Sequence, residues 1–93
     1  MELDEARKRL NKIDSGLLEL LEHRMEVVSH IAQYKENHGL PVRDPAREEE
    51  IIASVAQQVN EEMVPYAVRF TEMILELSRD YQTERRKNNG KNR

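Results

Sequence analysis

The chain contains no cysteine and no tryptophan, and it has only three glycines and three prolines among its 93 residues. Without cysteine, neither a disulfide framework nor a thiolate metal site can form, and a reducing compartment suits the protein. It also lacks an apolar run long enough to span a bilayer. Its first residues, MELDEARKRL, are charged from the second position and do not resemble a secretory signal. We therefore expect a cytoplasmic protein that does not bind membranes.

Positive charge is scarce outside the carboxy-terminal end. Residues 85–93 carry five Lys or Arg and no acid, which leaves residues 1–84 with ten basic and 18 acidic side chains. Nucleic-acid binding draws on a basic face that neutralises many phosphates, so this acidic part does not favour a nucleic-acid partner. We expect one domain over residues 1–84, followed by a basic, disordered tail over residues 85–93.

The first 37 residues contain one glycine and no proline, and their apolar side chains recur at intervals of three and four residues. This spacing predicts one long helix with an apolar stripe. The stripe consists of Leu3, Ala6, Leu10, Ile13, Leu17, Leu20, Val27 and Ile31. At 1.5 Å per residue the helix would be roughly 50 Å long, too long for two short helices of the same chain to cover. We expect it to pair with a second copy of itself, as sustained heptad seams do.

The long helix is expected to end at Gly39 and Pro41, which supply a left-handed cap and then a residue that cannot continue the hydrogen-bond ladder. A second helix is expected from Asp44, as N-cap, with Pro45 in the first helical position, and it fades near Asn60. Its expected buried stripe is Ile51, Ile52, Val55, Ala56 and Val59.

A third helix is expected from about Pro65 until the charge run that begins at Glu84. One of its faces is apolar and consists of Ala67, Phe70, Ile74, Leu77 and Tyr81. No segment of the chain alternates with a period of two, so no sheet is expected. The predicted fold class is therefore all-α, with a three-helix protomer.

Arg24 occupies a position where the heptad pattern predicts an apolar residue. A guanidinium there would be partly buried and would need an anionic partner, because an unpaired buried charge is very costly. Lys35 lies eleven residues later, so both cations point to one side of the helix with Cα atoms roughly 16 Å apart. Together they could bind an anion of metabolite size. The alternative is that Arg24 pairs with a core carboxylate such as Glu48, and that Lys35 is an ordinary surface lysine.

Glu48, Ser78 and Gln82 also stand where the pattern predicts apolar residues. Glu48 lies in the first turn of the second helix, where the helix dipole favours a carboxylate. Ser78 and Gln82 continue the row of Ile74 at intervals of four, and a buried amide must be hydrogen-bonded. Together with Arg24 and Lys35, these residues provide cations, hydrogen-bond donors and one carboxylate acceptor. None of them is a nucleophile beside a base. The three histidines share one helix without a fourth ligand, so no metal site is expected.

These residues occur in an order that resembles the all-helical chorismate mutases over roughly residues 3–84. The resemblance rests on Arg7 with Asp14 seven residues later, Arg24 in a leucine-rich helix, Lys35 near the end of that helix, the string PVRDPAREEE, and Ser78 with Gln82. One arginine would carry little weight, but this series at these spacings is specific.

The resemblance implies an enzyme that converts chorismate to prephenate, in the biosynthesis of phenylalanine and tyrosine, without a cofactor. Two protomers would interlock through their long first helices into an antiparallel homodimer with two identical sites. Arg24 and Arg7 would bind the carboxylates of the substrate, with Arg7 donated by the other chain. The spacing agrees with this, because the two arginines lie roughly 25 Å apart along one helix and about 100° around its axis.

By similarity, Lys35 and Gln82 would hydrogen-bond the ether oxygen of the breaking C–O bond, and Ser78 would assist at a carboxylate. The reaction is a concerted rearrangement within one molecule, so it needs no nucleophile, proton transfer or redox cofactor. A protein can accelerate it by binding the compact, reactive conformer and by stabilising the charge that grows on the ether oxygen.

Glu48, with the backbone near Arg47, would hold the ring hydroxyl of the substrate, and Asp44 would organise the start of the second helix. This hydroxyl contact separates the expected activity from the nearest alternative, an isochorismate pyruvate lyase of the same fold, whose substrate carries its hydroxyl elsewhere. Another alternative is a non-catalytic helical dimer or regulatory module, although a scaffold has no use for Arg24 in its seam. Whether the chain is free-standing or belongs to a larger enzyme stays open.

Overall fold

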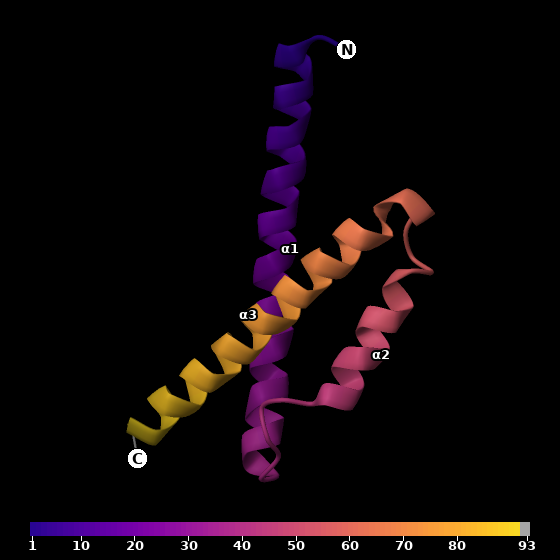
Figure 1. Cartoon of the computed structure of the whole chain (residues 1–93). Helices are drawn as coiled ribbons and strands as arrows, with labels where there is room; N and C mark the ends of the chain where they lie inside the picture. Colours follow the sequence, from indigo (N-terminus) through magenta and orange to yellow (C-terminus); the bar gives the residue numbers. More distant parts are fainter. Residues whose placement is uncertain (92–93) are drawn as a thin grey trace.

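The computed structural model of the chain describes residues 1–91, with side chains through residue 89. Its regular elements are α1 (Leu3–Asn37), α2 (Pro45–Val55), the short 3-10 helix η1 (Glu61–Met63) and α3 (Val64–Lys91). Residues 1–91 contain no strand. Figure 1 shows α3 crossing the middle of α1 diagonally, with α2 beside it, and α3 contacts both of these helices and η1. The predicted all-α, three-helix protomer is confirmed.

The long first helix is present as predicted. It spans 35 residues, carries Asp4 and Glu5 in its first turn, where they complement the helix dipole, and ends at Asn37. Gly39 follows with a φ of 66°, the left-handed conformation that favours glycine. The backbone N–H of Leu40 then donates to the carbonyl oxygen of Lys35 at 2.8 Å, which satisfies one of the last carbonyls of the helix.

The second helix begins as predicted but ends earlier than expected. The carboxylate of Asp44 accepts from the backbone N–H of Arg47 at 3.2 Å, and Pro45 occupies the first helical position. The helix ends at Val55 instead of near Asn60, because the backbone N–H groups of residues 57 and 58 bond to carbonyls only three residues back. Such bonds tighten the last turn and close the helix.

The third helix runs further than predicted, since residues 85–91, where a disordered tail was expected, continue α3. Long-range contacts hold this extension against the end of α1. The guanidinium of Arg86 donates to the carbonyl oxygen of Leu40, and the amide of Asn89 donates to the carboxylate of Glu36 at 3.0 Å. Basic residues near a helix C-terminus also complement its dipole. Residues 92 and 93 of the predicted tail lie outside the described residues.

The protomer is thin and has little interior. Its Cα atoms extend over 56 × 28 × 14 Å, and the apolar side chains that are buried in the described residues are Val28, Ala32, Val55 and Leu75. Of the stripe expected on the second helix, only Val55 is buried, and Ala56 and Val59 lie exposed beyond the end of α2. No helix in residues 1–91 is long and apolar enough to cross a membrane.

Candidate active site

A cavity of about 330 Å³ opens where the C-terminal half of α1, the start of α2 and the middle of α3 converge. Its lining includes all but one of the eight residues singled out in the sequence. These residues are Arg24, Lys35, Asp44, Arg47, Glu48, Ser78 and Gln82. They come from three segments of the chain, so the tertiary fold brings them together. Arg7 is the exception, since it is exposed near the start of α1.

Arg24 and Ser78 are joined directly. The guanidinium Nη1 of Arg24 donates to the hydroxyl oxygen of Ser78, and that hydroxyl donates to the carbonyl oxygen of Ile74 at 2.8 Å. Burial lowers the pKa of Arg24 from its usual value, because desolvation disfavours the charged form. An arginine nevertheless stays protonated at any working pH. The cavity wall therefore holds a fixed, partly desolvated positive charge.

Lys35 fixes the segment that leads into α2. Its ammonium donates to the carbonyl oxygen of Val42 at 2.7 Å, and the side chain is half-buried. An ammonium has three donors, so this bond leaves others to turn toward a ligand. Because Lys35 and Arg24 both line the cavity, the interpretation of Lys35 as an ordinary surface lysine does not hold.

Glu48 pairs with Arg79, a residue that the sequence analysis missed. The Nη1 atom of Arg79 lies 2.7 Å and 2.8 Å from the two carboxylate oxygens of Glu48. The alternative that Arg24 pairs with Glu48 is therefore wrong, since Glu48 is bound to Arg79 and Arg24 to Ser78. Arg79 could have been found in the sequence because it lies four residues after the apolar Leu75 and directly follows Ser78, so its side chain is close to the same face of the helix.

Asp44 and Arg47 organise the start of α2 through the backbone. Asp44 accepts from the N–H of Arg47, while the guanidinium of Arg47 turns outward to Glu50, at 3.2 Å. The backbone carbonyl of Asp44 also accepts from the N–H of Glu48 at 3.0 Å. These bonds fix the first turn of α2, and with it the position from which Glu48 extends into the cavity.

Gln82 and Ser78 are the two buried polar residues of the cavity, each with 6 % of the residue exposed. The Oε1 atom of Gln82 has no hydrogen-bond partner among the described residues. Buried polar atoms are nearly always hydrogen-bonded, so an orphaned one in a cavity wall points to a ligand. Rotating the terminal amide by half a turn exchanges its oxygen and its NH2 group, so Gln82 can present either an acceptor or a donor.

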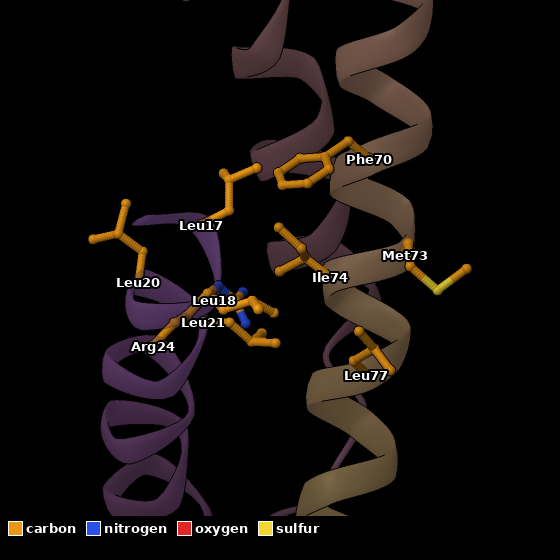
Figure 2. Close-up of a pocket in the computed structure, with 9 residues that line it drawn as sticks. All are labelled: Leu17, Leu18, Leu20, Leu21, Arg24, Phe70, Met73, Ile74 and Leu77. Carbon is orange, nitrogen blue, oxygen red and sulfur yellow. The ribbon is translucent and has the colours of Figure 1, made fainter. Parts of the chain in front are cut away.

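A second cavity, of about 320 Å³, lies on the other side of Arg24 and is almost entirely apolar. Figure 2 shows Leu17 and Leu21 of α1 facing Phe70, Ile74 and Leu77 of α3. Apolar walls cannot bind a polyanion, because charged groups lose their hydration there without gaining hydrogen bonds. This second cavity is suited to take up apolar side chains.

The chemistry available in the first cavity is electrostatic. Arg24 and Lys35 supply positive charge, Arg79 is paired with Glu48, and Ser78 and Gln82 supply neutral polar groups. The hydroxyl proton of Ser78 is committed to Ile74. Residues 1–91 contain no group of three His, Cys, Asp or Glu side chains that could hold a metal ion. The arrangement is suited to bind an anion in a chosen conformation and to stabilise developing negative charge.

Several known proteins are similar to parts of this chain. The T-protein of Enterobacter agglomerans is 34% identical over 64 residues, which cover 69% of this chain and 17% of that protein. A chorismate mutase of Methanocaldococcus jannaschii is 32% identical over 62 residues, covering 67% and 63% of the two chains. The 4-amino-4-deoxychorismate mutase of Streptomyces venezuelae is 37% identical over 46 residues, covering 50% and 45%.

The aligned part of the chain thus spans less than two thirds of each of these relatives. No solved structure matches the chain. The sequence profile of the family described as chorismate mutase type II, however, matches residues 6–83, which include the whole of the cavity lining. The chain therefore belongs to the chorismate mutase type II family.

Proposed function

We propose that the chain is a chorismate mutase, which rearranges chorismate to prephenate in the biosynthesis of phenylalanine and tyrosine. The observation that carries the proposal is the convergence of Arg24, Lys35, Ser78 and Gln82 in one cavity of about 330 Å³. Family membership supports the same substrate. Chorismate is a dianion of metabolite size, and its rearrangement breaks a C–O bond and forms a C–C bond within one molecule.

Arg24 binds the substrate carboxylates, and Ser78 assists by accepting a hydrogen bond from its guanidinium. The planar guanidinium fork matches a carboxylate in two hydrogen bonds, which holds the floppy dianion in the compact conformer that reacts. Arg24 is already oriented by its bond to Ser78, so little ordering remains when the substrate arrives. A bound carboxylate also offsets the desolvation that lowers the pKa of this arginine.

Lys35 and Gln82 stabilise the negative charge that grows on the ether oxygen as the C–O bond lengthens. Both lie on the wall of the same cavity, and the Oε1 atom of the buried Gln82 amide has no hydrogen-bond partner among the described residues. Donors aimed at developing charge in a water-poor site contribute more than the same donors in water. No cofactor or metal takes part in this step.

The active enzyme is proposed to be a homodimer. The protomer exposes 7722 Å², which is about 2,100 Å² more than the roughly 5,600 Å² expected of a compact monomer of 11.0 kDa. Many of the exposed large apolar residues lie along α1, and they include Leu3, Leu10, Ile13, Leu17, Leu18, Leu20, Val27 and Ile31. Burying such an area between two chains is typical of obligate dimers.

In that dimer, Arg7 of each chain completes the site of the other. The N-terminal half of α1 extends well beyond its crossing with α3 (Figure 1), and Arg7, near the start of this half, is exposed. Arg7 is roughly 25 Å from Arg24 along the helix, too far for both to bind one small ligand. An antiparallel partner brings its own Arg7 toward Arg24, and its leucines can enter the apolar cavity beside that arginine.

Glu48 accepts a hydrogen bond from the ring substituent of the substrate, with the backbone near Arg47 beside it and Asp44 organising the turn. A second candidate function concerns this substituent, because one relative is named 4-amino-4-deoxychorismate mutase. Its substrate carries an amine where chorismate carries the ring hydroxyl. Competition between the two compounds for the purified chain decides between them, and we expect chorismate to be preferred.

The proposal is tested in cells by rescue. A bacterial strain that requires phenylalanine and tyrosine because it lacks chorismate mutase is supplied with this chain, and growth without the two amino acids is the expected result. Lys35→Met, produced at an equal soluble level, should not restore growth. Failure of the parental chain to rescue while it accumulates as folded protein would contradict the proposal.

A further inference from the structure

Glu48 forms an ion pair with Arg79 on the wall of the cavity, and Arg79 has no contact with the substrate in the chemistry proposed above. One guanidinium nitrogen, Nη1, contacts both carboxylate oxygens, at 2.7 Å and 2.8 Å. The side chains are 30% and 18% exposed, so the pair is partly withdrawn from water. Arg79 comes from α3 and Glu48 from α2, so the pair also fixes the carboxylate relative to the helix that carries Ser78 and Gln82.

The pair leaves Glu48 able to accept further hydrogen bonds. A carboxylate offers about four lone-pair sites, and Arg79 occupies one on each oxygen. A hydroxyl on the substrate ring can therefore still donate to Glu48. The negative charge of Glu48, however, is already neutralised by Arg79.

This neutralisation decides what kind of donor is favoured. A carboxylate alone attracts an ammonium group more strongly than a neutral hydroxyl, because opposite charges attract. Beside Arg79, an approaching ammonium meets a like charge, and Arg24 and Lys35 line the same cavity. Like charges brought together in a partly desolvated site are strongly unfavourable, whereas a neutral hydroxyl is not affected.

We propose that Arg79 is a positioning residue that sets substrate specificity: by holding and neutralising Glu48, it makes the cavity prefer a neutral hydroxyl over an ammonium at the facing ring position. The inference rests on the proposed function, because it takes Glu48 as the residue that faces this position. Arg79 itself acts through Glu48 and does not contact the reacting bond.

The test compares kcat/KM for chorismate and for 4-amino-4-deoxychorismate, at a slightly acidic pH where the amine is protonated. The specificity ratio is kcat/KM for chorismate divided by kcat/KM for the amino compound. In Arg79→Gln this ratio should fall by about tenfold or more, because the repulsive charge is gone. Arg79→Lys keeps the charge and should keep the ratio close to the parental one. Arg69→Gln removes the same charge from an exposed position of α3 and should change neither value.

Glu48→Gln gives a second, independent result, since it leaves Arg79 without its carboxylate. The ratio should then rise, because the ammonium meets an uncompensated cation. An equal loss on both substrates in Arg79→Gln, or a ratio that moves in the same direction in both variants, would overturn the inference while the chorismate activity of the parent stands. A parental protein that transforms neither compound would overturn the proposed function itself, and the inference with it.

Discussion

The guanidinium of Arg24, on α1, donates a hydrogen bond to the hydroxyl of Ser78, which lies 54 residues later on α3. This bond joins two helices at the wall of the cavity and orients a cation whose pKa is lowered by burial. A charge held in this way is costly for the fold and useful for binding an anion. The same residue should therefore show opposite effects on stability and on activity.

Arg24→Met should separate these effects. Since burial lowers the pKa of Arg24, the charged form is disfavoured in the folded state, and this cost persists at every pH below the folded pKa. Replacing the cation by an apolar chain of similar length removes the cost, and Ser78 keeps its bond to Ile74. We expect an unchanged or higher melting temperature, with kcat/KM lowered about 100-fold or more. Arg69→Met is the exposed control, and a clear loss of stability in Arg24→Met alone would contradict this explanation.

Gln82→Glu should make activity depend on pH. The amide of Gln82 can donate to the ether oxygen at any pH, whereas a glutamate, with a reference pKa of about 4.3, donates only when it is protonated. Activity of the variant should fall as the pH rises through the pKa of the new carboxyl, while the parent shows no such limb. Gln82→Ala is the control, with a loss that does not depend on pH. An equally flat profile for Gln82→Glu and the parent would refute the role given to Gln82.

The dimer can be tested through Leu20, which points outward from α1 and is 65% exposed in the protomer (Figure 2). Leu20→Glu places a charge on the surface proposed to be covered by the second chain, and an unpaired buried charge is strongly destabilising. Light scattering at micromolar concentration should give a dimer for the parent and a monomeric or unfolded, inactive chain for the variant. Ala53→Glu adds the same charge on an exposed part of α2 and should remain dimeric. A parental chain that is folded, active and monomeric rules the dimer out.

Sharing of the site between chains predicts complementation. Arg7→Ala and Arg24→Ala should each be nearly inactive, since each removes one carboxylate-binding arginine from both sites of the dimer. In a mixed dimer one site receives both arginines and the other receives neither. If the two variants are unfolded together and refolded, half of the dimers are mixed, and roughly a quarter of parental activity should return. Activity no higher than that of the variants refolded separately, with mixed dimers verified by mass, means that each site lies within one chain.

Local signals in the sequence were sufficient for the helix boundaries that depend on caps. Gly39 ends α1 and Asp44 with Pro45 begins α2 because these residues have conformational preferences that act on their neighbours alone. The cavity lining was also predictable in large part, because Arg24 and Gln82 stand at positions where the helical pattern requires apolar residues. Whether those residues perform the proposed roles remains a prediction.

What could not be predicted depends on contacts between distant segments. The extension of α3 to Lys91 is held by a hydrogen bond from Arg86 to the carbonyl oxygen of Leu40, 46 residues away. The composition of residues 85–93 alone favoured a disordered tail. The partner of Glu48 likewise comes from another helix, 31 residues later. Arg79 escaped notice because a charged residue beside an apolar row is common on helix surfaces, and only the packing of α2 on α3 reveals its partner.

The most direct test of the proposed activity is to follow purified chorismate and its products by proton NMR after addition of the purified chain. Prephenate should appear in equal amount to the chorismate lost, without added metal or cofactor, and Lys35→Met at the same concentration should leave the chorismate at its spontaneous rate of decay. If the parental chain leaves chorismate to decay only at its spontaneous rate, or yields pyruvate in place of prephenate, the activity proposed for this cavity is contradicted.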